Sequence, residues 1–195
     1  MIVHLAARVW RVPVTSNVRP HMSKDHLLGV FRTALNQIKL AYASMVLWSY
    51  PDTPRFFEAL YAELQIPKPF SDTVSFVRDD RAMRIACEQA YVSAHMSALK
   101  DLLGILRTYC HETGQLGTLK AQPWFPFWKI LRNCFAHDTR FNFDPTERAL
   151  LPITWSGVTI DISMNGQHLS HGTMSREKMR ELVEVAYAFI ESDLT

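Results

Sequence analysis

Residues 85–110, IACEQAYVSAHMSALKDLLGILRTYC, decide the fold class of this chain. Apolar side chains recur along the stretch at the spacing of one face of an α-helix. The positions that carry this period are Ile85, Val92, Met96, Leu99, Leu103, Leu106 and Cys110. The period predicts a long helix from about Thr73 or Asp80 to Cys110.

Helical periods also precede this stretch. Ser23 is the predicted N-cap of an amphipathic helix that ends before the sequence YPDTP, at residues 50–54. Its apolar face comprises Leu27, Phe31, Leu35, Ile38, Tyr42, Met45 and Trp48. Thr53, with Pro54 at the first helical position, predicts a shorter helix that IPKPF, at residues 66–70, ends. The face of this helix comprises Phe57, Leu60, Tyr61 and Leu64.

Two further helices are predicted nearer the C-terminus. One lies near Pro126 to Ala136, and the other follows Ser175 as its N-cap. The apolar face of the last helix comprises Met179, Leu182, Val183, Ala186, Phe189 and Ile190.

The period changes between these two helices. The sequences ITW, VTIDIS and QHLS are typical of short strands, joined at SG and at NG, and the NG pair favours a β-hairpin. Alternating apolar residues at 3–12 suggest one more strand near the N-terminus. We therefore expect a mainly α protein: an up-and-down helical bundle with a small antiparallel β-hairpin or meander before the C-terminal helix. Residues 1–195 would form a single domain, with an N-terminal strand or extension over 1–22.

Composition limits the class of protein. The 195 residues are 48% apolar and 21% charged, and the seven glycines argue against an all-β design. Three scattered cysteines, Cys87, Cys110 and Cys134, indicate reduced thiols and hence a cytoplasmic location. No run approaches the roughly 18 apolar residues of a membrane span, so no membrane partner is expected. A net charge of +2 does not by itself indicate nucleic-acid binding.

Residues 128–143, WKILRNCFAHDTRFNF, place three polar side chains in an otherwise apolar helix. Arg132 and His137 point roughly 140° apart on an ideal helix, so they do not share one face. They would converge if the helix ended near Ala136, or if the arginine folded back across the axis. A second copy of the helix, supplied by a dimer, would also gather them around one cleft.

This trio suits a phosphodiester substrate. The guanidinium of Arg132 can hold a phosphate and stabilise charge in the transition state. The imidazole of His137 can take a proton from a ribose 2′-hydroxyl or give one to the departing 5′ oxygen, and Asn133 can orient either group. No metal or cofactor is needed. Alternatively, the arginine and histidine only cap the carbonyls at the helix end.

The sequence LRNCFAH, residues 131–137, resembles the signature of the HEPN superfamily (higher eukaryotes and prokaryotes nucleotide-binding). That signature is an arginine, commonly followed by asparagine, and a histidine after a short spacer. The order of the predicted elements over residues 23–192 is also similar to that family.

The resemblance implies a homodimeric helical domain whose two motifs line a shared groove. Such proteins are often metal-independent endoribonucleases of toxin–antitoxin or antiviral defence systems, with an antitoxin or defence-system partner. His137 would be the acid/base group, Arg132 the phosphate contact and Asn133 a polar helper. Some HEPN toxins have a modified tyrosine two residues after the histidine, where this chain has Thr139. Other members bind RNA or a nucleotide without cutting it.

A second polar stripe lies on the long helix. Arg84, Glu88, Tyr91 and His95 recur on one helix face. They would form either a solvated stripe with an Arg84–Glu88 ion pair or a second, substrate-binding wall of the groove. In the second case Arg84, Glu88 and His95 would contact substrate, and Glu88 would orient the arginine or histidine of the motif.

An aromatic sequence and a pair of histidines do not by themselves indicate a function. The aromatic sequence WFPFWK, residues 124–129, favours packing in the core or a dimer contact over stacking on bases. His168 and His171 lack the spacing of a zinc motif, so no metal site is predicted. Three functions stay open: a ribonuclease, a non-catalytic RNA- or nucleotide-binding module, and a protein-interaction module.

Overall fold

The fold is mainly helical, with a two-stranded antiparallel sheet before the last helix, as predicted. It was obtained as a computed structural model, which describes residues 22–63, 76, 79–170 and 172–195. The strand predicted over 3–12, the IPKPF segment and His171 lie outside these residues.

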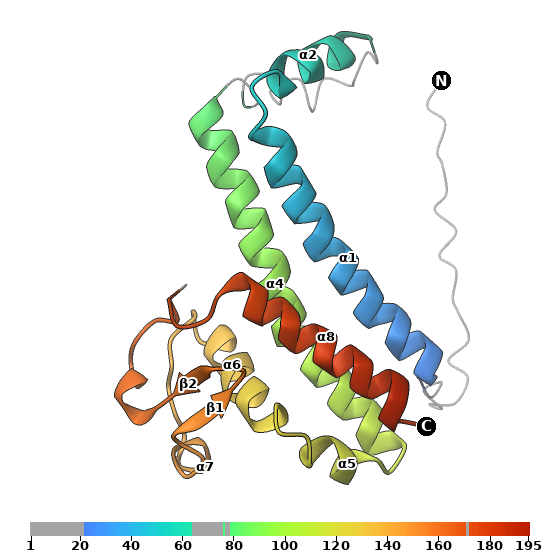
Figure 1. Ribbon diagram of the computed structural model, residues 1–195, viewed down its shortest axis with the longest axis vertical. Coiled ribbons are helices and arrows are strands. Elements are labelled where there is room, and N and C mark those ends of the chain that lie inside the picture. The colour runs from blue at the N-terminus through green and yellow to red at the C-terminus, as the bar shows by residue number, and fades with distance from the viewer. Residues whose placement is uncertain (1–21, 64–75, 77–78, 171) are drawn as a thin grey trace, which may run out of the picture.

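Two long helices form the frame of the molecule (Figure 1). Helix α1, Lys24–Trp48, begins where the Oγ of Ser23 accepts a hydrogen bond from the N–H of His26, at 3.2 Å. Helix α4, Asp80–Glu112, begins where Asp79 accepts a hydrogen bond from the N–H of Ala82, at 2.9 Å. Both N-caps satisfy an amide that has no partner within its helix. Of the two predicted starts for the long helix, the structure has Asp80.

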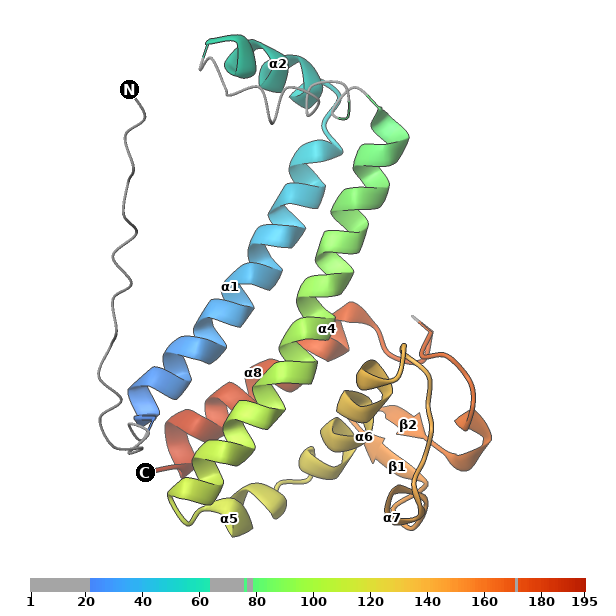
Figure 2. The ribbon, with the colours of Figure 1, turned by 180° about the vertical axis from the view of Figure 1, so that it is seen from behind.

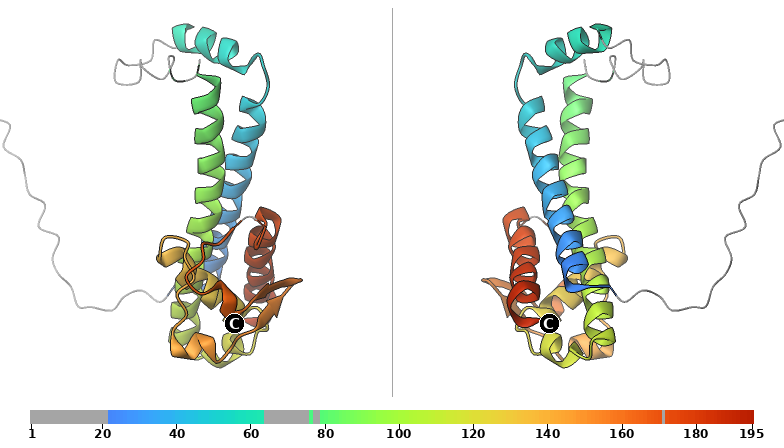
Figure 3. Two further views of the ribbon diagram at one scale, coloured as in Figure 1. Left: turned by 90° about the vertical axis from the view of Figure 1, so that its left-hand side faces the viewer. Right: turned by 90° about the vertical axis from the view of Figure 1, so that its right-hand side faces the viewer.

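The far halves of α1 and α4 project beyond the body of the molecule (Figures 1 and 3). At their tip lies α2, Thr53–Glu63, and the Thr53 hydroxyl donates a hydrogen bond to the Leu47 carbonyl, at 2.7 Å. Ile85, which the period assigned to the buried face of α4, is 51% exposed. That assignment was wrong because α6 and α8 lie against the other half of α4, as Figure 2 shows.

The core forms where three helices cover that other half of α4. They are α5 (Leu116–Lys120), α6 (Phe125–Ala136) and α8 (Arg176–Asp193), and α8 also packs on α1. Trp128 is fully buried and donates its indole N–H to the Leu99 carbonyl, at 2.7 Å. Trp124, Phe125 and Phe127 are buried with it, which confirms the core interpretation of the aromatic sequence.

The small sheet comprises β1, Ile153–Trp155, and β2, Val158–Ile160. Its register pairs Ile153 with Ile160 and Trp155 with Val158. The joining residues Ser156 and Gly157 have φ of 47° and 79°, as a two-residue hairpin turn requires. The hairpin predicted at SG is therefore confirmed.

The NG sequence, Asn165–Gly166, makes a turn but not a second hairpin. It follows a short 3₁₀ helix, η2, Ile162–Met164, and the Gln167 N–H closes the turn on the Met164 carbonyl, at 2.9 Å. Asn165 has φ −58° and ψ 126° and Gly166 has φ 81°, which is a type II turn. The third strand predicted at QHLS was wrong: a type II turn does not match the twist of a hairpin, and the chain there pairs with the segment after α6 instead.

Candidate functional site

His137 lies immediately after the end of α6. The helix ends at Ala136, and His137 is its C-cap, with φ −119° and ψ 56°. Its backbone N–H donates to the Cys134 carbonyl, at 3.1 Å, and its side chain is exposed. This is the helix-end position expected from the sequence, which removes His137 from the regular angular spacing of α6.

The chain turns sharply after His137. The Arg140 N–H donates to the His137 carbonyl, at 2.9 Å, and the two residues between have positive φ, 52° at Asp138 and 59° at Thr139. Aspartate tolerates this left-handed region, but a β-branched threonine there is strained by roughly 1–3 kcal/mol. The Leu169 N–H donates to the Thr139 carbonyl, at 2.7 Å, and helps hold the turn. Strain of this kind recurs at functional sites.

Arg132 is exposed on α6 and contacts the next residue. Its Nη1 donates to Oδ1 of Asn133, at 3.2 Å, and Nδ2 of Asn133 donates to Oε1 of Glu147, at 2.6 Å. Glu147 is only 2% exposed and belongs to α7, Pro145–Arg148. The asparagine amide therefore links an exposed guanidinium to a buried carboxylate.

The sequence left open that Arg132 and His137 only cap the carbonyls at the end of α6. In the described part of the chain, neither Arg132 nor His137 donates a side-chain hydrogen bond to a carbonyl of α6. Both side chains remain at the surface, where a ligand can reach them.

Glu147 contacts the motif through Asn133, and the motif did not reveal this contact. It forms a capping box with Asp144: the Glu147 N–H donates to Oδ1 of Asp144, at 2.8 Å, and the Asp144 N–H donates to Oε2 of Glu147, at 3.2 Å. The N–H of Glu147 lowers the pKa of Asp144 because it stabilises the carboxylate. The D-x-x-E sequence at 144–147 is a visible sign of such a box, but the contact with Asn133 is not.

A second arginine and a second histidine lie beside the motif. Nη2 of Arg140 donates to Nε2 of His168, at 2.8 Å, and Nη1 donates to the Gly166 carbonyl, at 2.6 Å. Arginine cannot accept, so Nε2 of His168 is the unprotonated nitrogen. Nδ1 of His168 then carries the proton and faces the Thr139 hydroxyl, at 3.4 Å. Sequence reasoning missed this pair because its members are 28 residues apart.

The polar stripe on α4 divides in two. Arg84 is exposed and pairs with Asp80, at 3.2 Å, whereas Glu88 pairs with Arg176 of α8, at 2.8 Å. The expected Arg84–Glu88 pair was therefore wrong, and Glu88 does not orient Arg132 or His137. Arg84 lies roughly 16 Å along the helix from His95, at 1.5 Å per residue. Within the described residues, neither Arg84 nor Glu88 contacts Arg132, Asn133 or His137.

His95 is the member of that stripe that approaches the end of α6. It is 1% exposed, and it shares the lining of one pocket with Phe135 and Thr139, which flank His137 in the chain. Its Nδ1 donates to the Tyr91 carbonyl, at 2.9 Å, because a carbonyl can only accept. Burial lowers the pKa of His95, since it disfavours the charged ring.

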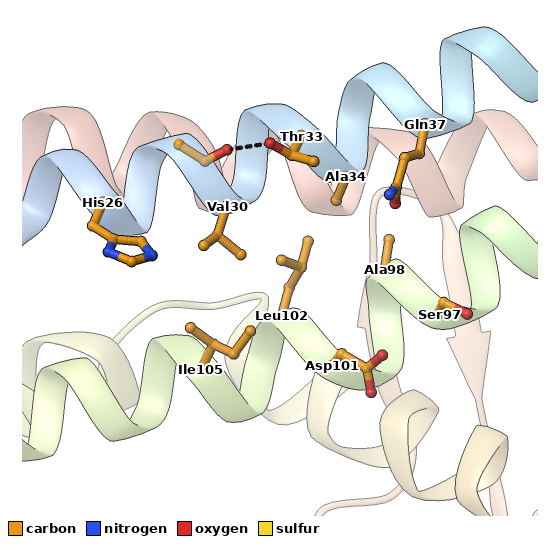
Figure 4. A pocket seen from close by; sticks show the side chains of 11 residues that line it. His26, Val30, Thr33, Ala34, Gln37, Ser97, Ala98, Asp101, Leu102 and Ile105 are labelled. Atoms are coloured by element: carbon orange, nitrogen blue, oxygen red, sulfur yellow. Dashed lines mark hydrogen bonds between the residues drawn. The ribbon is translucent and has the colours of Figure 1, made fainter. Parts of the chain in front are cut away.

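A separate groove of about 510 Å³ lies between α1 and α4 (Figure 4). Figure 4 shows Val30 of α1 and Leu102 of α4 pointing toward one another across it. The Thr33 hydroxyl on its edge donates to the Gly29 carbonyl of its own helix, at 2.9 Å. No residue of the motif lines this groove. Arg132, Asn133 and His137 lie instead at the end of α6, which we therefore take as the candidate site.

The described residues carry neither a metal-binding cluster nor a helix that could span a membrane. Within them, no three histidine, cysteine or acidic side chains group in a way that could hold a metal ion. None of the helices in those ranges has the length and apolar character needed to cross a bilayer.

No family model, curated protein or solved structure matches this chain.

Proposed function

We propose that the protein is a metal-independent endoribonuclease of the HEPN type that acts as a homodimer. The observation that carries the proposal is the end of α6. There Arg132 and His137 are both exposed, and Asn133, held by the buried Glu147, contacts the arginine. An accessible guanidinium and an accessible imidazole, five residues apart at the end of one helix, are the two groups that phosphodiester cleavage needs.

In the proposed reaction His137 takes the proton of a ribose 2′-hydroxyl. The 2′ oxygen then attacks the adjacent phosphorus, and the bond from phosphorus to the 5′ oxygen breaks. Arg132 stabilises the charge on the phosphoryl oxygens, and the protonated His137 gives the proton that it took to the departing 5′ oxygen. The products are a 2′,3′-cyclic phosphate and a 5′-hydroxyl. Arg140 adds a second exposed cation beside the turn, which favours binding of a polyanion.

The biological setting of the proposal is a toxin–antitoxin or antiviral defence system in the cytoplasm. Its support is the resemblance of residues 131–137 to the HEPN signature. Thr139 replaces the tyrosine that some HEPN toxins carry, so we propose an antitoxin or defence partner that controls the protein by binding and not through that tyrosine.

The test is cleavage of a labelled RNA by the purified protein in excess EDTA. We expect wild type to cut, and His137→Ala to slow cleavage by roughly 10²- to 10⁴-fold, the usual contribution of an acid/base group. Arg132→Ala should also lose most activity. The matched controls are His111→Ala and Arg107→Ala, which remove an exposed histidine and an exposed arginine from α4. Equal cleavage by His137→Ala and its control would overturn the proposal.

A protein-interaction module is the second candidate, and the tip of the molecule favours it. Large apolar side chains are exposed there, among them Leu47, Tyr50, Phe56 and Leu60, and these four line one pocket of about 590 Å³. Exposed apolar patches of this kind mark interaction sites. This candidate predicts no RNA cleavage and a partner lost on Phe56→Ser. The aromatic sequence at 124–129 cannot be the contact, because it is buried in the core.

A non-catalytic RNA- or nucleotide-binding module is the third candidate. The exposed guanidinium groups of Arg132 and Arg140 favour it, since they can hold phosphates whether or not His137 transfers a proton. It predicts binding that weakens as salt is raised and no turnover of bound RNA.

A further inference from the structure

A pocket of about 250 Å³ opens between α4, the end of α6 and the start of α8. Its walls are mostly apolar and include Met96 of α4, Phe135 of α6 and Met179 of α8. Thr139, Ser170 and Arg176 are further polar residues of the lining, and Thr139 lies two residues after His137 in the chain. The pocket therefore borders the site that we propose for RNA cleavage.

His95 gives the pocket an unusual chemical character. Its imidazole forms part of the wall, and Nδ1 is committed to the Tyr91 carbonyl, at 2.9 Å. Nε2 is buried and has no hydrogen-bond partner. With the proton on Nδ1, Nε2 of the neutral ring is an acceptor, and an unpaired buried acceptor is rare in folded proteins. A ligand that donates a hydrogen bond here would satisfy it.

Because Nε2 is buried, a ligand reaches it only when neighbouring side chains move. Three methionines line the pocket, at positions 96, 174 and 179. Methionine is unbranched and polarisable, so it moves aside readily and packs well on a flat aromatic ring. The ring of Phe135 also lines the pocket, and a flat ring of a ligand could stack on it.

We propose that this pocket binds an RNA base bearing an exocyclic amino group, adenine or cytosine, whose amino N–H donates to Nε2 of His95. The proposal rests on the ribonuclease function: the base belongs to a nucleotide next to the bond that is cut. Arg132 and His137 act on the backbone at the end of α6, and the pocket selects the base beside it.

The test uses adenosine and purine riboside, which lacks the amino group, as probes of the wild-type protein. With methionine methyl groups labelled by ¹³C, adenosine should shift the NMR signals of Met96, Met174 and Met179. The signal of Met45, on the projecting half of α1, should stay in place. Purine riboside should bind at least about tenfold more weakly, because it leaves the buried acceptor unpaired.

A substitution provides the second measurement. His95→Phe keeps a ring but removes the acceptor, so it should bind the two nucleosides with affinities within about twofold of each other. Equal binding of both nucleosides by wild type would overturn the proposal even if His95→Phe fails to fold, and so would unchanged pocket methionine signals. Nucleoside binding is measured without cleavage. Failure of the proposed ribonuclease function would therefore appear only in the RNA cleavage assay in EDTA. Failure of the proposed base pocket would appear only in the nucleoside-binding measurements.

Discussion

The link between Asn133 and Glu147 can be tested by a double-mutant cycle. The three variants are Asn133→Ala, Glu147→Ala and the double substitution. Glu147 is almost completely buried and accepts the Asn133 amide at 2.6 Å, so each single change leaves a polar group without its partner. The double change removes both members of the pair together.

The magnitude follows from the bonds that are lost. A hydrogen bond to a charged group contributes roughly 1.5–3 kcal/mol, so Asn133→Ala should lower the free energy of unfolding by about 2 kcal/mol. Glu147→Ala also removes one buried methylene group, at roughly 0.8 kcal/mol, and should cost about 3 kcal/mol. The double variant loses the shared bond once, which leaves a coupling energy of about 2 kcal/mol.

Urea unfolding followed by circular dichroism measures these free energies. The control is the same cycle at Thr154 and Thr159, an exposed hydroxyl pair 2.8 Å apart on the small sheet, where each substitution should change stability by less than about 0.5 kcal/mol. A coupling below about 0.5 kcal/mol between Asn133 and Glu147 would refute the positioning role of Glu147, since the two side chains would then act independently.

Two further predictions concern buried titrating groups. Burial raises the pKa of Cys110 to about 11 and that of Cys134 to about 12, so both thiols should resist a disulfide reagent at pH 8 in the native state and react fully after unfolding; rapid native reaction would contradict their burial. Because burial lowers the pKa of His95, the unfolded state binds its proton first as pH falls below about 6.5. The free energy of unfolding should therefore decrease from pH 7.5 to 5.0. This decrease should be smaller in His95→Phe than in wild type or in the control His111→Ala, and urea midpoints at the two pH values measure it.

The helices could be predicted because their signals are local. A period of 3.6 residues and an N-cap such as Ser23 or Ser175 lie within a few residues of one another, and both caps form as expected. Burial was less predictable, since it depends on where other elements end. Ile85 continues the apolar stripe of α4, yet it is 51% exposed.

The site shows the same limit. The position of His137 at the end of α6 could be predicted from the motif and the length of the helix. The partners of the motif could not, because they come from distant parts of the chain. Glu147 reaches Asn133 from a short helix beyond the turn, and His168 reaches Arg140 only because the chain after the NG turn runs back beside it.

The central claim is that the end of α6 cleaves RNA without a metal. The most direct measurement is the chemistry of the product ends, after wild type and His137→Ala have acted on one RNA in excess EDTA. We predict 2′,3′-cyclic phosphate and 5′-hydroxyl ends from wild type, and at least a hundredfold less of both from the variant. Products ending in a 5′-phosphate, or equal yields from the two proteins, would contradict the claim.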